Sequence, residues 1–262
     1  MPADQKILFH STIFGPVHSR RLGTSLGINL SPNDGKICSF DCIYCEAGYN
    51  RQGAGTTGFP SRESVRTELK NKLQQMKDEG SGLDVITFSG NGEPTLHPDF
   101  AGIVEDTIAL RDSFYPEAKV SVLSNSTRLG NKDVDKALRK VDNNILKLDS
   151  AIEETMRLID CPNQSGFTVE KVLKDLEKFG KECIIQTMML RGTHDGQPVD
   201  NTTDAEINAL AEAYRRINPE YVMLYSLDRS TPEENLQKVE RPELETIARR
   251  LQSLSGVTVN VS

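Results

Sequence analysis

The sequence alternates short apolar runs with longer segments of helical character, and this alternation constrains the fold more than any other feature. The apolar runs are partly β-branched and have the length of buried strands. Strands and helices that alternate in this way form parallel βαβ units. The six runs are LGINL (26–30), DVITFSG (84–90), KVSVLSN (119–125), NILKLDS (144–150), CIIQTMML (183–190) and YVMLYSL (221–227). They predict an α/β fold, a partial (β/α)6 TIM-type barrel with a parallel sheet.

The segments between the runs have helical periodicity or composition. They cover 61–80, 99–112, 132–140, 167–180 and 203–217. Ser61 is a typical helix N-cap, and Gly80 and Gly180 are typical helix ends. After the sixth run, only a helix (243–254) and a short strand, VTVNV (257–261), remain. Because this is too little chain for two standard βα units, we expect an open barrel of six strands with a short helix-strand extension at the C-terminus.

Length and composition set the domain organisation and exclude some partners. A chain of 262 residues with 37% hydrophobic residues can bury a full core. We expect one domain over 1–262, with a core of about 24–228 and an extension of about 229–262. No apolar run approaches the roughly 20 residues that cross a bilayer, and the first residues do not resemble a signal peptide. We therefore expect a cytoplasmic protein with no membrane partner.

The charge balance bears on nucleic acids as partners. The formal net charge is −7 and the pI is near 5.3. Binding to phosphate backbones depends on clustered Lys and Arg, and the basic runs of this chain are short. The composition therefore argues against a nucleic acid partner.

Three of the five cysteines lie in the stretch CSFDCIYC, directly after the first predicted strand. Barrel enzymes build their sites from such loops after strands. An odd, clustered set of thiols does not suggest a disulfide framework, and thiolates favour zinc or iron–sulfur centres. His18 or His97 could complete a zinc site, but neither has a second ligand at a short spacing. Three cysteines around a four-iron cluster would leave one iron open to a substrate or cofactor.

The spacing Cys-x3-Cys-x2-Cys, with Tyr44 before the last cysteine, resembles the cluster loop of the radical S-adenosylmethionine (radical SAM) superfamily. FSGNGEPT (88–95) resembles the family's Gly-Gly-Glu-Pro motif, with Asn91 at the place of the usual first glycine. VLSNST (122–127) resembles the ribose-contacting end of the next strand. The stretches GPVHSRRLGTSLGINL, KLDS, QTMMLRG and YSLDRSTPEE resemble the short bacterial iron–sulfur oxidoreductases related to archaeal wyosine synthases.

The resemblance implies two cofactors and a radical reaction. Cys38, Cys42 and Cys45 would bind a [4Fe-4S] cluster, and its open iron would bind S-adenosyl-L-methionine (SAM). Reductive cleavage of SAM would give a 5′-deoxyadenosyl radical that abstracts hydrogen from a substrate, small or macromolecular. The electron would come from a low-potential donor such as flavodoxin or ferredoxin.

The same resemblance assigns residues to SAM. The backbone around Gly92 and Glu93 would bind the methionine amino group. Ser124 and Asn125 would bind the ribose, and Tyr44 would lie near the adenine. A cationic amine and a ribose diol both need polar partners once water is excluded.

The run at 144–150 suggests residues that act on the substrate. Alternation along a strand places Leu146 and Leu148 on one face and Lys147 and Asp149 on the other. The apolar face should meet the helices, so the charged pair should point into the barrel. We expect Lys147 and Asp149 to be catalytic; a structural ion pair that fills the barrel is the alternative.

The sequence is also compatible with three other functions. A wyosine-type enzyme would modify tRNA, although relatives of that type carry additional N-terminal cysteines and this chain has none before Cys38. A glycyl-radical activating enzyme would act on a protein. A non-catalytic iron–sulfur electron carrier would need four protein ligands and no open iron.

Overall fold

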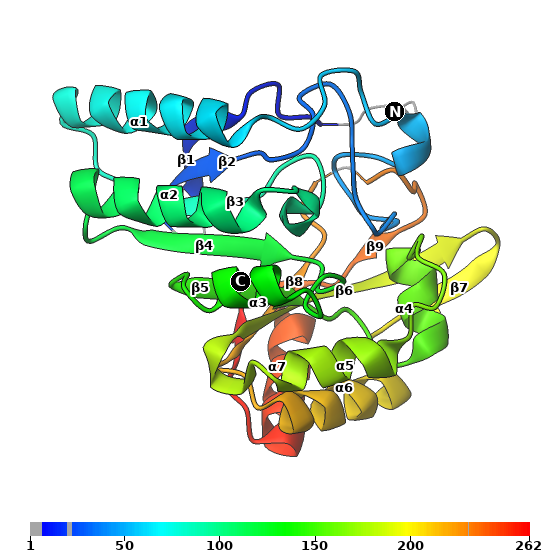
Figure 1. The fold of residues 1–262 in the computed structure, drawn as a ribbon. Coiled ribbons are helices and arrows are strands. Elements are labelled where there is room, and N and C mark those ends of the chain that lie inside the picture. Colours follow the sequence, from blue (N-terminus) through cyan, green and yellow to red (C-terminus); the bar gives the residue numbers. More distant parts are fainter. Residues whose placement is uncertain (1–6, 20–22, 230) are drawn as a thin grey trace.

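The structure, a computed structural model, describes residues 7–19, 23–229 and 231–262 (Figure 1). Residues 20–22 of the stretch GPVHSRRLG therefore lie outside the described residues. The strands are β1 Ile13–Ser19, β2 Gly23–Ile28, β3 Val85–Phe88, β4 Lys119–Ser124, β5 Asn143–Lys147, β6 Ile184–His194, β7 Gln197–Asp200, β8 Val222–Ser226, β9 Gln237–Lys238 and β10 Val259–Val261. The helices are α1 Arg62–Asp78, α2 Phe100–Phe114, α3 Lys132–Leu138, α4 Glu153–Asp160, α5 Val169–Glu177, α6 Asp204–Ile217 and α7 Arg241–Ser255.

The sheet is open and mostly parallel. Its strand order is β1-β2-β3-β4-β5-β6-β8-β10, and neighbours from β2 to β10 run parallel. The strands at the two ends of this order do not pair with each other in the described part of the chain. The predicted α/β fold and the open, partial barrel are confirmed.

The strand inventory differs from the prediction at both ends. β10 pairs in parallel with β8, with Val259 opposite Val222, so the C-terminal helix and strand add a seventh parallel strand. β1 precedes the first predicted strand and runs antiparallel to β2. β7 and β9 both pair antiparallel with the long β6, beyond its parallel part.

Helix ends follow the local sequence. The Ser61 hydroxyl accepts a hydrogen bond from the amide of Ser64, as expected for the N-cap of α1. Gly80 and Gly180 have positive φ angles of 69° and 50°, which suits glycines placed just beyond a helix. Figure 1 shows α1 beside α2 and α5 beside α6, and these neighbours contact one another.

Alternation along the strands separates an apolar face from a polar one. Leu26, Ile86 and Leu146 belong to the main apolar core together with residues of the helices. On the opposite face, the hydroxyls of Ser25 and Thr87 are 2.9 Å apart. Leu146 and Leu148 are fully buried in the main core, as the sequence pattern predicts, and Lys147 points to the other side. One face of the sheet therefore packs in the apolar core, and the other carries polar groups.

Candidate functional site

The predicted site residues follow consecutive parallel strands, so they meet at one edge of the sheet. The cysteine loop follows β2, Glu93 follows β3, Asn125 follows β4 and Asp149 follows β5. A parallel bridge joins Ile37 to Gly92, which fixes the start of the cysteine loop against the segment after β3. This edge is where (β/α) barrels place their active sites.

The loop over residues 36–50, here called the cluster loop, is braced by its own side chains. The buried Lys36 ammonium donates to the carbonyl of Gly48 at 2.6 Å and to Asp41 Oδ1 at 3.3 Å. Asp41 Oδ1 also accepts from the amide of Asn50 at 2.7 Å, and Asn50 Nδ2 donates to the carbonyl of Cys38 at 3.1 Å. These bonds tie the beginning, middle and end of the loop together, so the three cysteines are held on a preformed scaffold.

The cysteines suit a thiolate-bound cluster. Cys42 is buried, while Cys38 and Cys45 are partly exposed, and the amide of Cys45 donates to the carbonyl of Cys42 at 3.1 Å. Burial raises the pKa of the Cys38 thiol to about 11 and that of Cys42 well above its usual value. Binding to iron would remove these protons. The soft sulfur donors, the buried Lys36 and the partly buried Lys147 fit a cluster that carries negative charge.

A single metal ion fits less well than a cluster. Among the described residues, no group of three His, Cys, Asp or Glu side chains is arranged to hold one ion. A four-iron cluster has no such requirement, because each cysteine binds its own iron. Both ring nitrogens of His97 have partners, the carbonyl of Pro60 at 2.7 Å and the amide of Asp99 at 3.0 Å. The side chain of His18 lies outside the described part of the structure.

The motif after β3 holds the cluster loop in place. The carbonyl of Ile37 accepts a hydrogen bond from the amide of Glu93 at 3.1 Å. A Cβ at position 92 would lie 1.9 Å from that carbonyl oxygen, so only glycine permits this approach. Asn91 is fully buried, and its side-chain Nδ2 donates to the carbonyls of Phe9 and Pro32 at 2.8 and 2.9 Å. The asparagine that replaces the usual glycine thus anchors two further segments at this edge.

The Glu93 side chain links the ends of β3 and β4. Its Oε1 accepts from Thr95 and from the Ser124 hydroxyl at 2.9 Å, and its Oε2 accepts from the amide of Asn125 at 2.7 Å. Burial raises the pKa of this carboxyl, and the hydrogen bonds from Asn125 and Thr95 offset part of the rise. The family resemblance assigns a role to the backbone of Glu93, whereas the structure shows its carboxylate bonded to Thr95, Ser124 and Asn125.

Ser124 and Asn125 differ in what they offer to a ligand. The buried Ser124 hydroxyl donates to Glu93 and accepts from the amide of Ser126 at 3.2 Å. Asn125 Nδ2 donates to Ser39 Oγ at 2.9 Å and contacts Cys38 Sγ at 3.5 Å. Asn125 therefore lies directly against the cluster loop, while Ser124 lies one step behind it.

Lys147 and Asp149 also contact the cluster loop. Lys147 Nζ lies 2.9 Å from Cys42 Sγ, 3.2 Å from Asp149 Oδ2 and 2.8 Å from Asp160 Oδ1. Asp149 is fully buried and accepts from the Tyr44 hydroxyl and, at 2.9 Å, from the amide of Met188. The Lys147 ammonium also sits over the Tyr44 ring, 4.6 Å from its centroid. The charged pair points into the barrel as predicted, and Lys147 contacts Cys42 of the cluster loop.

This network contains a residue that the sequence did not reveal. Asp160, at the end of α4, is fully buried, and burial raises its pKa to about 7 although Lys147 opposes the rise. Burial alone would lower the pKa of Lys147, but Asp149 and Asp160 outweigh it and raise that pKa well above its usual value. The only sequence signal was an acidic residue in a short amphipathic segment beside Cys161.

A second polar cluster adjoins the first. Cys161 Sγ lies 3.7 Å from His194 Nε2, and His194 Nδ1 lies 3.0 Å from Glu233 Oε1, which also accepts from the Tyr49 hydroxyl at 2.5 Å. Burial raises the pKa of Cys161 to about 11. Cys161, an isolated thiol in the sequence, is thus tied to the cluster loop through Tyr49.

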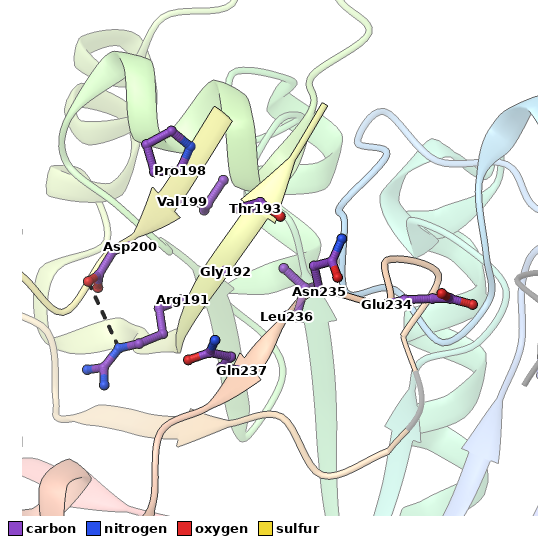
Figure 2. Close-up of a pocket in the computed structure, with 10 residues that line it drawn as sticks. All are labelled: Arg191, Gly192, Thr193, Pro198, Val199, Asp200, Glu234, Asn235, Leu236 and Gln237. Carbon is purple, nitrogen blue, oxygen red and sulfur yellow. Dashed lines mark ion pairs between the residues drawn. The ribbon is translucent and has the colours of Figure 1, made fainter. Parts of the chain in front are cut away.

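A cavity of about 620 Å³ opens beyond the end of the parallel part of β6. Figure 2 shows it between the β6–β7 hairpin and the segment 234–237, with Arg191 and Asp200 among the labelled residues. The Arg191 guanidinium lies 3.9 Å from Asp200 and 2.5 Å from Glu243. The cavity is lined by both polar and apolar residues. Among the described residues, no helix is both long and apolar enough to span a bilayer.

Comparisons with known structures show a common fold. The chain superposes on a radical SAM methyltransferase from Sphaerobacter thermophilus with a TM-score of 0.68 and 14% identity, over 91% of this chain and 65% of that one. A structure of TYW1 with a lysine-pyruvate adduct gives a TM-score of 0.59 at 19% identity, over 89% of this chain and 75% of that one. A structure of native anSMEcpe with bound AdoMet gives a TM-score of 0.56 at 18% identity, over 90% of this chain and 63% of that one.

Sequence comparisons find relatives of higher identity than these structures. It is 28% identical over 95% of its length to a Brachyspira hyodysenteriae protein named GTPase Obg, of which it spans 35%. It is 30% identical to a UPF0026 protein of Methanocaldococcus jannaschii, over 91% of this chain and 69% of that protein. It is 32% identical to a UPF0026 protein of Synechocystis, over 84% of this chain and 77% of that protein. Another, from Helicobacter pylori, is 27% identical over 83% of this chain, which spans 66% of it.

The family model named Radical SAM superfamily matches residues 33–205, about two thirds of the chain. The matched region contains the cluster loop, the Glu93 motif, the end of β4 and the Lys147 network. Members of that superfamily use a [4Fe-4S] cluster and SAM. The chain therefore belongs to the radical SAM superfamily and is a homologue of the UPF0026 proteins.

Proposed function

We propose that this protein is a radical SAM enzyme that binds a [4Fe-4S] cluster through Cys38, Cys42 and Cys45 and abstracts hydrogen from its substrate. When bound, the cluster would supply one electron to SAM. Reductive cleavage of SAM would then give methionine and a 5′-deoxyadenosyl radical. One observation carries the proposal. Three thiols lie on a braced loop at the carboxyl edge of the sheet, directly against the segments after β3 and β4.

The chain's own residues would hold and orient SAM. The backbone around Gly92 and Glu93 is fixed by the bridge to Ile37, and it would bind the methionine amino group. Asn125 would contact the ribose from its place beside Cys38, with Ser124 as a further contact. Tyr44 would lie near the adenine. These groups are positioned by protein contacts, so they need little rearrangement on binding.

The substrate side is set by what surrounds the cluster loop. We propose that Lys147 and Asp149 act after SAM cleavage, through contact with substrate or its proton, from the polar face of β5. A low-potential one-electron donor such as flavodoxin or ferredoxin would supply the reductant. The acidic net charge of −7 argues against nucleic acid as the substrate.

The open iron separates this proposal from an electron carrier, in which every iron has a protein ligand. We expect SAM to change the electron paramagnetic resonance (EPR) signal of the reconstituted, reduced cluster, because SAM would bind the iron that lacks a cysteine. S-adenosylhomocysteine serves as a related control ligand. A spectrum that did not change at saturating SAM would favour a fully ligated carrier cluster instead.

A further inference from the structure

The Lys147 ammonium has a complete set of acceptors. An ammonium group has three N–H donors and no acceptor. Three acceptors lie around Lys147 Nζ, namely Cys42 Sγ at 2.9 Å, Asp160 Oδ1 at 2.8 Å and Asp149 Oδ2 at 3.2 Å. A buried charge is costly unless such partners surround it. Two of the three partners are carboxylates that hold the lysine, and the third is a cysteine expected to bind iron.

The contact with Cys42 becomes stronger when that cysteine is a thiolate. As a thiol, Cys42 donates a hydrogen bond to Asp160 Oδ1 at 3.3 Å. A cysteine that binds iron has lost this proton and only accepts hydrogen bonds. Lys147 is then the donor that Cys42 and Asp160 share. Hydrogen bonds to a cluster's sulfur ligands and nearby charge set its reduction potential.

We propose that Lys147 raises the reduction potential of the cluster through its hydrogen bond to Cys42, and that Asp149 and Asp160 are positioning residues that hold it there. The inference rests on the proposed function, since it needs a cluster on Cys42. Reduction adds one negative charge to the cluster, and a hydrogen-bonded cation stabilises that charge. The effect is large because Lys147 is only 13% exposed and both aspartates are fully buried.

Asp160 gives the inference a second, opposite signature. It is 0% exposed, and its Oδ2 has no hydrogen-bond partner among the described residues. Its Oδ1 lies 3.3 Å from Cys42 Sγ, and Lys147 is its ion-pair partner. Asparagine at this position keeps an oxygen that can accept from Lys147 but removes the negative charge of the carboxylate. Asp160→Asn should therefore make the cluster easier to reduce, whereas removal of Lys147 should make it harder.

The test uses the full chain, reconstituted anaerobically with iron and sulfide. Midpoint potentials are measured by EPR-monitored redox titration for the wild type, Lys147→Met and Asp160→Asn. Lys119→Met is the matched control, because Lys119 is exposed and lies at the start of β4, at the end of the strand away from the site. Iron and sulfide content are measured for each protein, so that only loaded protein is compared.

We expect Lys147→Met to lower the equilibrium constant for reduction at least tenfold, which is about 59 mV for a one-electron couple. Asp160→Asn should shift the midpoint in the opposite direction, and Lys119→Met should leave it unchanged. A midpoint in loaded Lys147→Met equal to that of the wild type would overturn the inference. If Lys147→Met did not retain a cluster, the Asp160→Asn midpoint would decide, and no upward shift there would overturn it. A wild type that takes up no cluster would instead refute the proposed function.

Discussion

Alanine at Cys38, Cys42 or Cys45 is expected to remove most of the iron from the reconstituted protein. Each thiolate binds one iron, and its loss leaves that iron without a protein ligand in addition to the open one. The cluster loop is held by Lys36, Asp41 and other contacts that do not involve the sulfur atoms, so the apo fold should survive. Iron and sulfide analysis, together with the visible absorption of the cluster, measures this directly.

The two remaining cysteines are the matched controls. Cys183 is 1% exposed and donates to the carbonyl of Gly180 at 3.3 Å, and Cys161 faces His194. Alanine at either position should leave the iron content of the protein near that of the wild type. Full iron content in Cys38→Ala, or an equal loss in Cys161→Ala, would show that the ligands are assigned wrongly.

Replacement of Glu93 should disturb stability and SAM binding together. Its carboxylate accepts from Thr95, Ser124 and the amide of Asn125, all in the buried layer below the cluster loop. Glu93→Ala would leave these donors unpaired, at a cost of about 2–4 kcal/mol in the free energy of unfolding. Glu93→Gln keeps the size but places an NH2 group opposite a backbone N–H. We expect it to weaken SAM binding roughly tenfold, about 1.4 kcal/mol, because Asn125 loses its anchor.

Glu206 is a suitable control for Glu93. It is also buried, 3% exposed, and accepts from the Ser150 hydroxyl at 2.7 Å, but it lies on α6 and contacts none of the predicted SAM-binding residues in the described structure. Glu206→Gln should lower the melting temperature and leave SAM affinity unchanged. The measurements are thermal unfolding and equilibrium binding of SAM to loaded protein. Normal SAM affinity in Glu93→Gln would remove Glu93 from the cofactor site.

Much of the fold follows from patterns that lie within single segments. The six predicted strands were correct because each is an apolar run of strand length between helical segments. β1 was missed because its sequence, IFGPVHS, contains Gly-Pro and lacks clear alternation, and its pairing with β2 is a tertiary matter. α4 was missed because it has only eight residues and begins soon after β5. β7 and β9 are short edge strands whose pairing with β6 leaves little sequence signal.

The site could be predicted where a sequence motif marks it. It could not be predicted where it depends on contacts between residues far apart in the sequence. The cysteine spacing marked the loop, and alternation placed Lys147 on the inner face of β5. Two of the three partners of Lys147 could not be predicted, because Cys42 and Asp160 are 118 residues apart in sequence and meet only in the folded barrel. Lys36 was missed for another reason. A lysine near a cysteine loop resembles a solvated surface residue, and only its burial shows that it braces the loop.

Anaerobic reconstitution, reduction with dithionite and addition of SAM test the central claim, that this site cleaves SAM by one-electron reduction. Wild-type protein loaded with iron and sulfide should form 5′-deoxyadenosine and methionine slowly without substrate, and faster when cell extract supplies one. Cys42→Ala should form neither product above the level of reagents alone. Chromatographic quantification of 5′-deoxyadenosine against cluster content decides the matter. A fully loaded wild type that gave no 5′-deoxyadenosine, with or without extract, would contradict the assignment of a radical SAM reaction to this protein.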